Sequence, residues 1–279
     1  MTGELLGPPA LPIAGEPRQV TPRAVWLLAP NPGPMTFDGT NTWVLHEPGR
    51  RGSVIIDPGP DEPRHLSALA EVAKDLGGHV EMIVLTHGHP DHYAGANRLA
   101  RQVDAPVLAA DPRRGDRLVG PGDMDIAGLR VRVVATPGHS SDSLSFLLPA
   151  DDAIVTGDTV LGRSAPAILD PDGRVDQMIS SLELLRSMLD GGEPVILPGH
   201  GPLVTEPAAQ LELALSAREA RLEQMADAVR DGCETVAAIA DRVYGPFDER
   251  IRRAIEATVR AHLRYLLDQR RLSQPVKLE

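Results

Sequence analysis

The sequence contains few cysteines, lysines and aromatic residues. One cysteine, Cys233, occurs in 279 residues, so neither an intrachain disulfide nor a cysteine-built zinc site can form. Lysine occurs only at Lys74 and Lys277, so arginine carries nearly all of the positive charge. The 28 basic side chains are outnumbered by 39 acidic ones, and the net charge of −11 disfavours a protein that mainly coats nucleic acid or an anionic membrane.

Long hydrophobic runs are also missing. No stretch approaches the roughly 18 continuous apolar residues that a membrane-spanning helix needs, so we expect no membrane insertion. The first 16 residues lack a basic start followed by an apolar run, which disfavours a signal peptide. We therefore expect an extended N-terminal arm over residues 1–20 and a cytoplasmic protein. The sequence does not indicate an oligomeric state.

The remainder of the chain has the pattern of an α/β protein followed by a helical segment. Short strands are expected at 25–29, 42–46, 54–57, 80–85, 106–109, 131–135, 143–148, 153–156 and 194–197, with helices at 61–76, 93–103 and 176–190. The composition changes after Pro207, where the pattern predicts helices at 208–230, 234–243 and 248–271. We therefore expect a catalytic domain over 21–206 and a small helical domain over 207–279.

Five predicted strands run directly into polar side chains suited to binding metal. Strand ends lie along common edges of a sheet, and an adjacent glycine or proline lets the backbone turn and present the side chain. Imidazole nitrogen and carboxylate oxygen are ligands that suit zinc. Five histidines and two aspartates exceed the needs of one tetrahedral zinc and fit two metals that share a bridging carboxylate. These residues are His87, His89, Asp91, His92, His139, Asp158 and His200.

Some of the polar residues have a second interpretation. Asp57, which precedes Pro58 and Gly59, is also typical of a turn, and Asp158 alone is typical of a cap or turn. Asn41 fits a substrate contact and a turn asparagine equally. Arg163 is a candidate for an anionic substrate group, although a solvated arginine is the simpler interpretation. The remaining histidines are assigned structural or surface roles: His46, His65, His79 and His262.

The chain between residues 31 and 202 resembles the metallo-β-lactamase superfamily. The resemblance rests on 31–34 (NPGP), 39–42 (GTNT), 56–59 (IDPG), 86–92 (THGHPDH), 136–139 (TPGH), 157–159 (GDT) and 198–202 (PGHGP). It is most similar to the lactamase-beta-like group, which includes mitochondrial endoribonucleases and polyketide acyl-carrier thioesterases. The resemblance implies a four-layer αββα sandwich with metals at the edge of two facing sheets. The C-terminal segment resembles that group's winged-helix-like domain, with weaker sequence specificity.

The resemblance also implies a role for each metal-binding candidate. His87, His89 and His139 would hold the first zinc, and the second would be held by Asp91, His92 and His200. Asp158 would bridge the two Zn²⁺ ions, and Asp57 would position the histidine-rich loop without binding metal. True β-lactamases commonly use a cysteine in the second site, and none is available here, so antibiotic hydrolysis is disfavoured.

These expectations define a dizinc hydrolase that uses a metal-bridging hydroxide, with Asp91 and Asp158 as catalytic residues. We expect a thioester or acyl ester substrate, either small or carrier-bound, because the chain outside residues 206–279 has a net charge of −10 and repels a long polyanion.

An endoribonuclease acting on single-stranded RNA is the alternative. The helix at 248–271 carries arginines at 253, 260, 264 and 271 on one face, which fits either a phosphate backbone or a solvated helix surface. A mononuclear-iron persulfide dioxygenase is disfavoured, because the complete second ligand set is present.

Overall fold

The computed structural model describes residues 13–189 and 191–278. The first twelve residues of the predicted arm and the last residue of the predicted helix at 176–190 lie outside these ranges.

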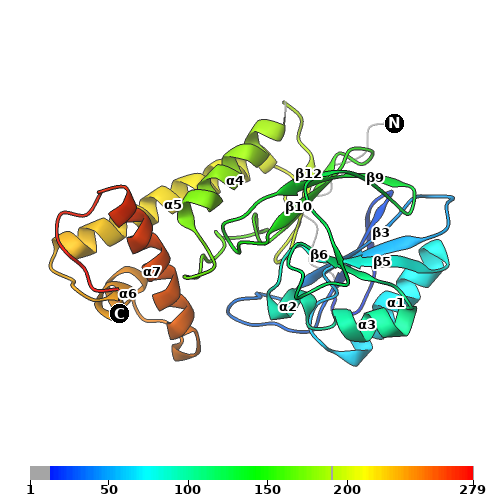
Figure 1. The fold of residues 1–279 in the computed structure, drawn as a ribbon, viewed down its shortest axis with the longest axis horizontal. Coiled ribbons are helices and arrows are strands. Elements are labelled where there is room, and N and C mark those ends of the chain that lie inside the picture. The colour runs from blue at the N-terminus through cyan, green and yellow to red at the C-terminus, as the bar shows by residue number, and fades with distance from the viewer. Residues whose placement is uncertain (1–12, 190, 279) are drawn as a thin grey trace.

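Two β-sheets face each other in the part of the chain between residues 18 and 198 (Figure 1). The first sheet contains, in spatial order, β1 (Arg18–Thr21), β2 (Ala24–Leu28), β3 (Asn41–His46), β4 (Ser53–Ile56), β5 (Val80–Val84), β6 (Val107–Ala109) and β7 (Arg117–Leu118). The second contains β12 (Val195–Pro198), β11 (Ala153–Gly157), β10 (Leu144–Leu148), β9 (Leu129–Ala135) and β8 (Gly122–Ile126).

Helices cover the outer faces of both sheets. On the first sheet lie α1 (Pro63–Gly77) and α3 (Ala96–Val103), and α2 (Pro90–Tyr93) lies at one end of the sheet; on the second lies α4 (Val175–Met188). The C-terminal part consists of α5 (Pro207–Arg230), α6 (Val236–Tyr244), the 3-10 turn η1 (Glu249–Ile251) and α7 (Arg252–Asp268). This arrangement confirms the expected αββα sandwich with a C-terminal helical region.

The core between the sheets is continuous and apolar. Strands β2, β3 and β4 are buried along their whole length, because one face packs on α1 and the other on the second sheet. Trp26 and Trp43 stack between the sheets with ring centroids 5.5 Å apart. This packing holds the two sheets in one relative position, and so fixes the edge where their strand ends meet.

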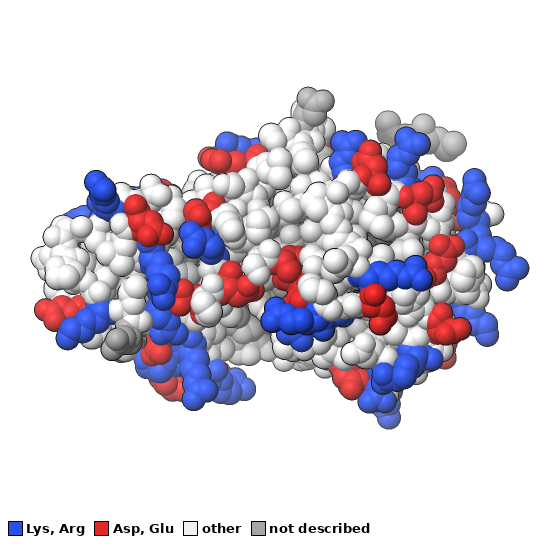
Figure 2. All heavy atoms as spheres, viewed as in Figure 1, with Lys and Arg blue, Asp and Glu red and all other residues white. Residues whose placement is uncertain are grey.

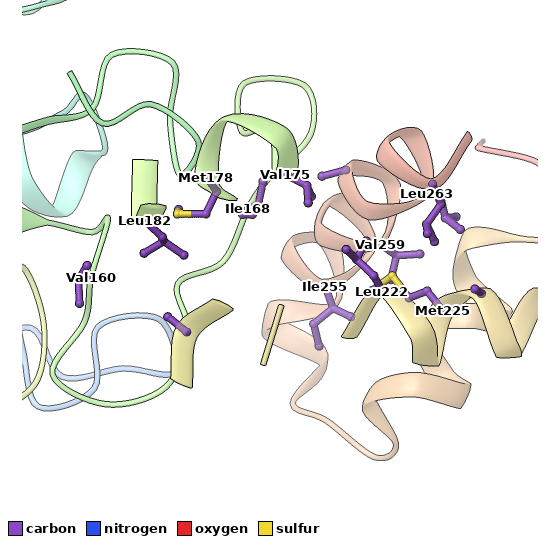
Figure 3. Close-up of a cluster of buried hydrophobic side chains, with 14 of the residues drawn as sticks. Val160, Ile168, Val175, Met178, Leu182, Leu222, Met225, Ile255, Val259 and Leu263 are labelled. Atoms are coloured by element: carbon purple, nitrogen blue, oxygen red, sulfur yellow. The ribbon is translucent and has the colours of Figure 1, made fainter. Parts of the chain in front are cut away.

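A second apolar cluster joins the sandwich to the C-terminal helices (Figure 3). Met178 and Leu182 of α4 pack against the second sheet, while Leu222 and Met225 of α5 face Val259 of α7. Helix α5 extends from the sandwich to the other C-terminal helices. It begins at Pro207, where the change of composition places the domain boundary, although the division into domains stays a prediction.

Several secondary-structure expectations require correction. Residues 18–21 lie partly in the predicted arm, yet they form β1, which pairs antiparallel with β2. The single helix expected at 93–103 is divided into α2 and α3, and at Gly95 between them a Cβ would collide with Leu66 and the Pro60 carbonyl. Strand β8 is not among the expected strands because it is a short edge strand, GDMDI, in which only Met124 and Ile126 are apolar and which contains a glycine and two aspartates, residues that are depleted in strands.

The surface carries charges of both signs. In Figure 2, acidic side chains are interspersed with basic ones, and basic side chains gather near the C-terminal helices at the lower left. Within the described ranges, no helix combines the length and hydropathy needed to cross a membrane. The winged-helix likeness stays a prediction, since beyond its helices this region shows, in the described residues, one isolated bridge between Thr235 and Lys277.

Replacing Leu222 with Ala should destabilise the C-terminal helices. Leu222 is fully buried between α5 and α7, and leucine-to-alanine changes in cores cost about 2–5 kcal/mol. Urea unfolding followed by circular dichroism measures the loss. Leu213→Ala on the same helix is the matched control, because its side chain is 60% exposed and should change stability by less than about 0.5 kcal/mol. Equal midpoints for the two variants would contradict the packing.

Candidate metal centre

The histidines and aspartates singled out in the sequence meet at one edge of the two sheets. Strands β4 and β5 are parallel, as are β11 and β12, so the carboxyl ends within each pair point the same way. Strand β9 is antiparallel to β10, which is antiparallel to β11, so β9 also ends in that direction. The loops that follow these strands therefore carry all seven candidate ligands to the same place.

Close backbone approach at this edge requires glycine. A Cβ at Gly199, just before His200, would collide with Asp158 Oδ1 and the His92 ring. Gly138 has φ of +137°, and a Cβ there would collide with the backbone of Met178 on α4. Because they lack a Cβ, Gly199 lets the loop of His200 lie against Asp158 and His92, and Gly138 lets the loop of His139 lie against α4.

Asp57 is hydrogen-bonded to both ends of the histidine-rich loop at residues 86–92. It is 1% exposed and has a left-handed φ of 52°, directly after β4. Its Oδ1 accepts a hydrogen bond from the Thr86 backbone N–H at 2.7 Å, and its Oδ2 accepts from Thr86 Oγ1 at 2.6 Å and from His92 Nδ1 at 2.8 Å. Both carboxylate oxygens are therefore engaged, as expected for a residue that positions the loop.

The hydroxyl of Thr86 connects Asp57 to His87 and fixes the orientation of the His87 ring. Because Thr86 donates its hydroxyl hydrogen to Asp57, it accepts from His87 Nδ1 at 3.0 Å, and His87 Nε2 is left without a proton. His139 is held similarly, since its Nδ1 donates to the Ala167 carbonyl at 2.7 Å. The Nε2 lone pairs of both rings then point inward.

These lone pairs converge with that of a third ring. His89 Nδ1 lies 3.0 Å from His87 Nε2 and 2.8 Å from His139 Nε2. Burial lowers the pKa of His89 to about 4 and holds that of His87 well below its usual range, so these two rings are neutral at pH 7. Neutral nitrogens gathered within hydrogen-bond distance of one another form a set that a metal cation can satisfy together.

A second group lies beside the first. His92 Nε2 and His200 Nε2 are 3.2 Å apart, and Asp91 Oδ2 is 3.1 Å from His200 Nε2. The opposite nitrogens face away, because His200 Nδ1 donates to the Gly39 carbonyl at 3.0 Å and His92 Nδ1 bonds Asp57. Asp91, His92 and His200 thus form a second set able to hold a metal ion.

Asp158 lies between the two groups. Its Oδ2 is 3.5 Å from His139 Nε2 in the first group and 3.5 Å from His200 Nε2 in the second. Its Oδ1 is 3.5 Å from His92 Nε2, and this buried oxygen has no hydrogen-bond partner among the described residues. A buried carboxylate oxygen without a partner is costly, and a cation at this position would satisfy it.

The electrostatics of the second group also favour a cation. Although burial opposes the shift, Asp158 and Asp91 raise the pKa of His200 to about 11. Burial likewise opposes the shift at Asp91, whose pKa His92 and His200 lower to about 2. The negative charge that binds a proton on His200 attracts a metal ion to the same nitrogen, and binding would displace that proton.

A third grouping able to hold metal comprises Asp57, His87 and His92. It shares His87 with the first group and His92 with the second. Because both Asp57 oxygens accept hydrogen bonds, this grouping offers fewer free donor atoms than the other two.

The proposed substrate contacts lie at the rim and beneath the site. Asn41 is fully buried: its amide nitrogen donates to the carbonyls of Pro198 and Gly201, both at 2.9 Å, and its oxygen accepts from Trp26 at 2.8 Å. Asn41 therefore supports the loop that carries His200, and direct substrate contact stays a prediction. Arg163 lies half-exposed beside Phe37, where it is paired with Asp38.

Sequence reasoning missed one buried cation near this edge. Arg218 on α5 is 5% exposed and donates to the Pro166 carbonyl, one residue before the carbonyl that binds His139. A signal for it is present in the sequence, because Arg218 interrupts an apolar stripe at helical spacing formed by Leu211, Ala214, Leu222 and Met225.

Comparison with known proteins agrees with the fold. The family model of the metallo-beta-lactamase superfamily matches residues 35–116 and 108–200. The chain is 30% identical over 257 residues to lactamase-like protein vrtG of Penicillium aethiopicum, covering 88% of this chain and 80% of that one. It is 28% identical to an atrochrysone carboxyl ACP thioesterase of Aspergillus fumigatus, covering 85% and 78% respectively.

A solved structure extends the likeness to nearly the whole chain. A beta-lactamase domain protein from Burkholderia ambifaria superposes with a TM-score of 0.78 at 23% identity, covering 93% of this chain and 90% of the other. At that identity the likeness concerns the fold, including the C-terminal helices. With its two facing sheets and the histidine–aspartate groups at their edge, the chain belongs to the metallo-beta-lactamase superfamily.

Replacing Asp57 with Asn should weaken metal binding without removing a ligand. The change keeps the size and tolerates the left-handed backbone, but it removes the charge that orients Thr86 and His92. Loss of such a supporting group typically costs 10–100-fold in affinity, which competition with a chelating dye measures. Asp61→Asn, at an exposed ion pair with Arg98, is the control. Equal affinities in both variants would show that Asp57 is only a turn residue.

Proposed function

We propose that this protein is a dinuclear zinc-dependent hydrolase of thioesters whose acyl group is carried on an acyl carrier or a small thiol. The observation that carries the proposal is the pair of ligand groups with Asp158 between them. In it, His87, His89 and His139 hold one zinc, Asp91, His92 and His200 hold the other, and Asp158 contacts both. Nitrogen donors together with carboxylates suit zinc. We also propose a cytoplasmic location.

The donor set fits such metals. Four of the five rings have their outer nitrogen bonded to Thr86, Asp57 or a backbone carbonyl, so the inner nitrogen is available. Two zinc ions, when bound, lower the pKa of water and polarise an ester carbonyl. The chain's own contribution is to hold these donors in place, to bury most of them, and to manage protons.

Asp91 is suited to handling the proton. Its side chain is 30% exposed, whereas those of His92, His200 and Asp158 are 0%, 0% and 9% exposed. Although burial opposes it, His92 and His200 lower the pKa of Asp91, so it is a carboxylate at neutral pH and accepts a hydrogen bond from water. It therefore faces the side from which substrate arrives and can orient a water molecule towards an acyl carbon.

A thioester matches this site chemically. A thiol leaves as an anion of moderate basicity, since its pKa is near 8.5, so its departure needs less protonation than that of an amine or alcohol. Among the relatives, the protein from Aspergillus fumigatus is named an ACP thioesterase. In this chain, the two carboxylates and five imidazoles would provide the site for the same reaction on an acyl-carrier substrate.

The arrangement of the C-terminal arginines gives less support to the RNA alternative. Arg264 pairs with Asp170 at 2.6 Å, and Arg271 pairs with Glu219 and Glu223 at 2.6 and 2.5 Å. Arg260 lies 3.9 Å from Asp170. Side chains already paired with carboxylates offer less charge to a phosphate backbone.

The proposal predicts two zinc ions per chain in the native protein. In Asp158→Ala, both the amount of bound zinc and the turnover should fall. Elemental analysis by mass spectrometry should give close to two zincs for the native protein and fewer for the variant, with an unchanged circular dichroism spectrum. Asp123→Ala on β8, at an exposed ion pair with Arg132 of β9, should behave as the native protein. A single iron per native chain would contradict the proposal.

Substrate class is tested by salt dependence. Hydrolysis of acyl-N-acetylcysteamine thioesters should change little between 50 and 300 mM salt, because few phosphate contacts release counterions. Cleavage of single-stranded RNA by the same preparation should be weak or absent. Robust metal-dependent RNA cleavage that falls steeply with salt, together with no thioester turnover, would reverse the assignment. Arg253→Ala should then flatten the salt slope.

A further inference from the structure

A pocket lies between the metal centre and the C-terminal helices. It has a volume of about 480 Å³ and is lined by the segment 164–167 and by side chains of α5 and α7; we call it the α5–α7 pocket. Its walls are mostly apolar and include Leu213, Ala214, Ala217 and Ile255. Met35 and Leu213 are 41% and 60% exposed, so large apolar surfaces face this space. Such a volume and lining are typical of a small-molecule site.

The pocket is connected to the metal centre through the backbone. Its wall contains Pro166 and Ala167, and the Ala167 carbonyl accepts the hydrogen bond from His139 Nδ1. Met35 lies in the same loop as Phe37, whose ring meets the His200 ring edge-on with centroids 6.4 Å apart. A molecule in the pocket is thus separated from the metal-binding histidines by one short segment of chain.

A buried positive charge lines this apolar space. Arg218 is 5% exposed, and its Nη2 donates to the Pro166 carbonyl at 2.8 Å. Its Nη1 faces His262 Nε2 at 3.3 Å, which accepts because His262 Nδ1 donates to the Thr258 carbonyl. Its Nε is buried and has no hydrogen-bond partner among the described residues. All partners of this guanidinium are therefore neutral.

A second arginine stands beside it. Arg221 is half-buried, donates to the Val243 carbonyl at 3.2 Å and lies over the Tyr244 ring at 4.3 Å. Burial lowers the pKa of Arg218 to about 10; Tyr244 opposes this shift, Arg221 adds to it, and no carboxylate in the described part of the chain contributes. Two neighbouring guanidinium groups without a carboxylate partner are costly to bury, and an anionic ligand would compensate them.

We propose that the α5–α7 pocket binds the body of an anionic thioester substrate and that Arg218, assisted by Arg221, receives its negative group. The inference rests on the proposed function and specifies the substrate further: an apolar acyl compound with one carboxylate or phosphate. The carboxylate would be at the far end of the acyl chain, and the phosphate would be on the carrier arm. Both have the planar or branched oxygen arrangement that a guanidinium binds with two hydrogen bonds.

Hydrolysis of matched substrates by the zinc-loaded protein tests the proposal and distinguishes the two sources. One pair is adipoyl-N-acetylcysteamine and its methyl ester, which differ in a terminal carboxylate. The other is hexanoyl-pantetheine with and without the 4′-phosphate. The native protein should prefer the anionic member of one pair by at least about tenfold in kcat/KM, and the pair that shows the preference identifies the source.

Arg218→Gln should remove that preference by lowering kcat/KM for the anionic member about tenfold or more, with little change for the neutral one. Arg230→Gln is the matched control on the same helix, because Arg230 is exposed and pairs with Asp227. Arg221→Gln, at the half-buried neighbour, should show a smaller loss and carries the test if Arg218→Gln does not fold. Equal losses for charged and neutral substrates would show a structural role only and would overturn the proposal.

A binding measurement separates failure of this inference from failure of the proposed function. Isothermal titration of the metal-free protein with octanoate and with octanamide requires no turnover. Octanoate should bind at least about tenfold more tightly to the native protein, and Arg218→Gln should abolish the difference. If no thioester is hydrolysed but this difference is present, the function is wrong and the anion pocket stands. Equal binding of the two compounds by the native protein would overturn the pocket itself.

Discussion

The candidate metal centre depends on hydrogen bonds made by imidazole nitrogens that face away from it. A histidine ring presents a lone pair in a chosen direction only when its other nitrogen is held by a fixed acceptor. Here each acceptor belongs to the rigid framework of the two sheets or to a loop tied to them. For His87, His92, His139 and His200 these acceptors are Thr86, Asp57 and the carbonyls of Ala167 and Gly39. The ligand geometry is therefore largely set before any metal binds.

Much of this arrangement could be predicted from the sequence. Apolar strands that end in Asp57, His139, Asp158 and His200, each next to glycine or proline, indicate a shared sheet edge. The parallel pairs β4–β5 and β11–β12 place three of them there, and β9, which runs in the same direction as β11, places His139. Asp57 is hydrogen-bonded to Thr86 and His92 of the histidine-rich loop, and its positioning role stays a prediction. These features were readable because they are local: a strand, a turn and a polar side chain follow one another within a few residues.

Features that depend on partners far away in the chain could not be predicted in this way. Asn41 is saturated by the carbonyls of Pro198 and Gly201, about 160 residues away, and a local pattern cannot distinguish that role from a turn. The edge strand β8 could not be predicted because its five residues include only two apolar ones, Met124 and Ile126, beside a glycine and two aspartates. The apolar stripe of α5 marks the position of Arg218 as buried, but the partners of its guanidinium, the Pro166 carbonyl and His262, lie about 50 residues away and no local pattern shows them.

The central claim is that two metal ions share Asp158 at the edge of the sheets. Crystals of the zinc-loaded protein, measured on both sides of the zinc absorption edge, test it most directly. The account predicts two anomalous peaks per chain, one surrounded by His87, His89 and His139 and the other by Asp91, His92 and His200, with a carboxylate oxygen of Asp158 bound to each. A single peak, or a peak bound by Asp57 in place of Asp158, would contradict it.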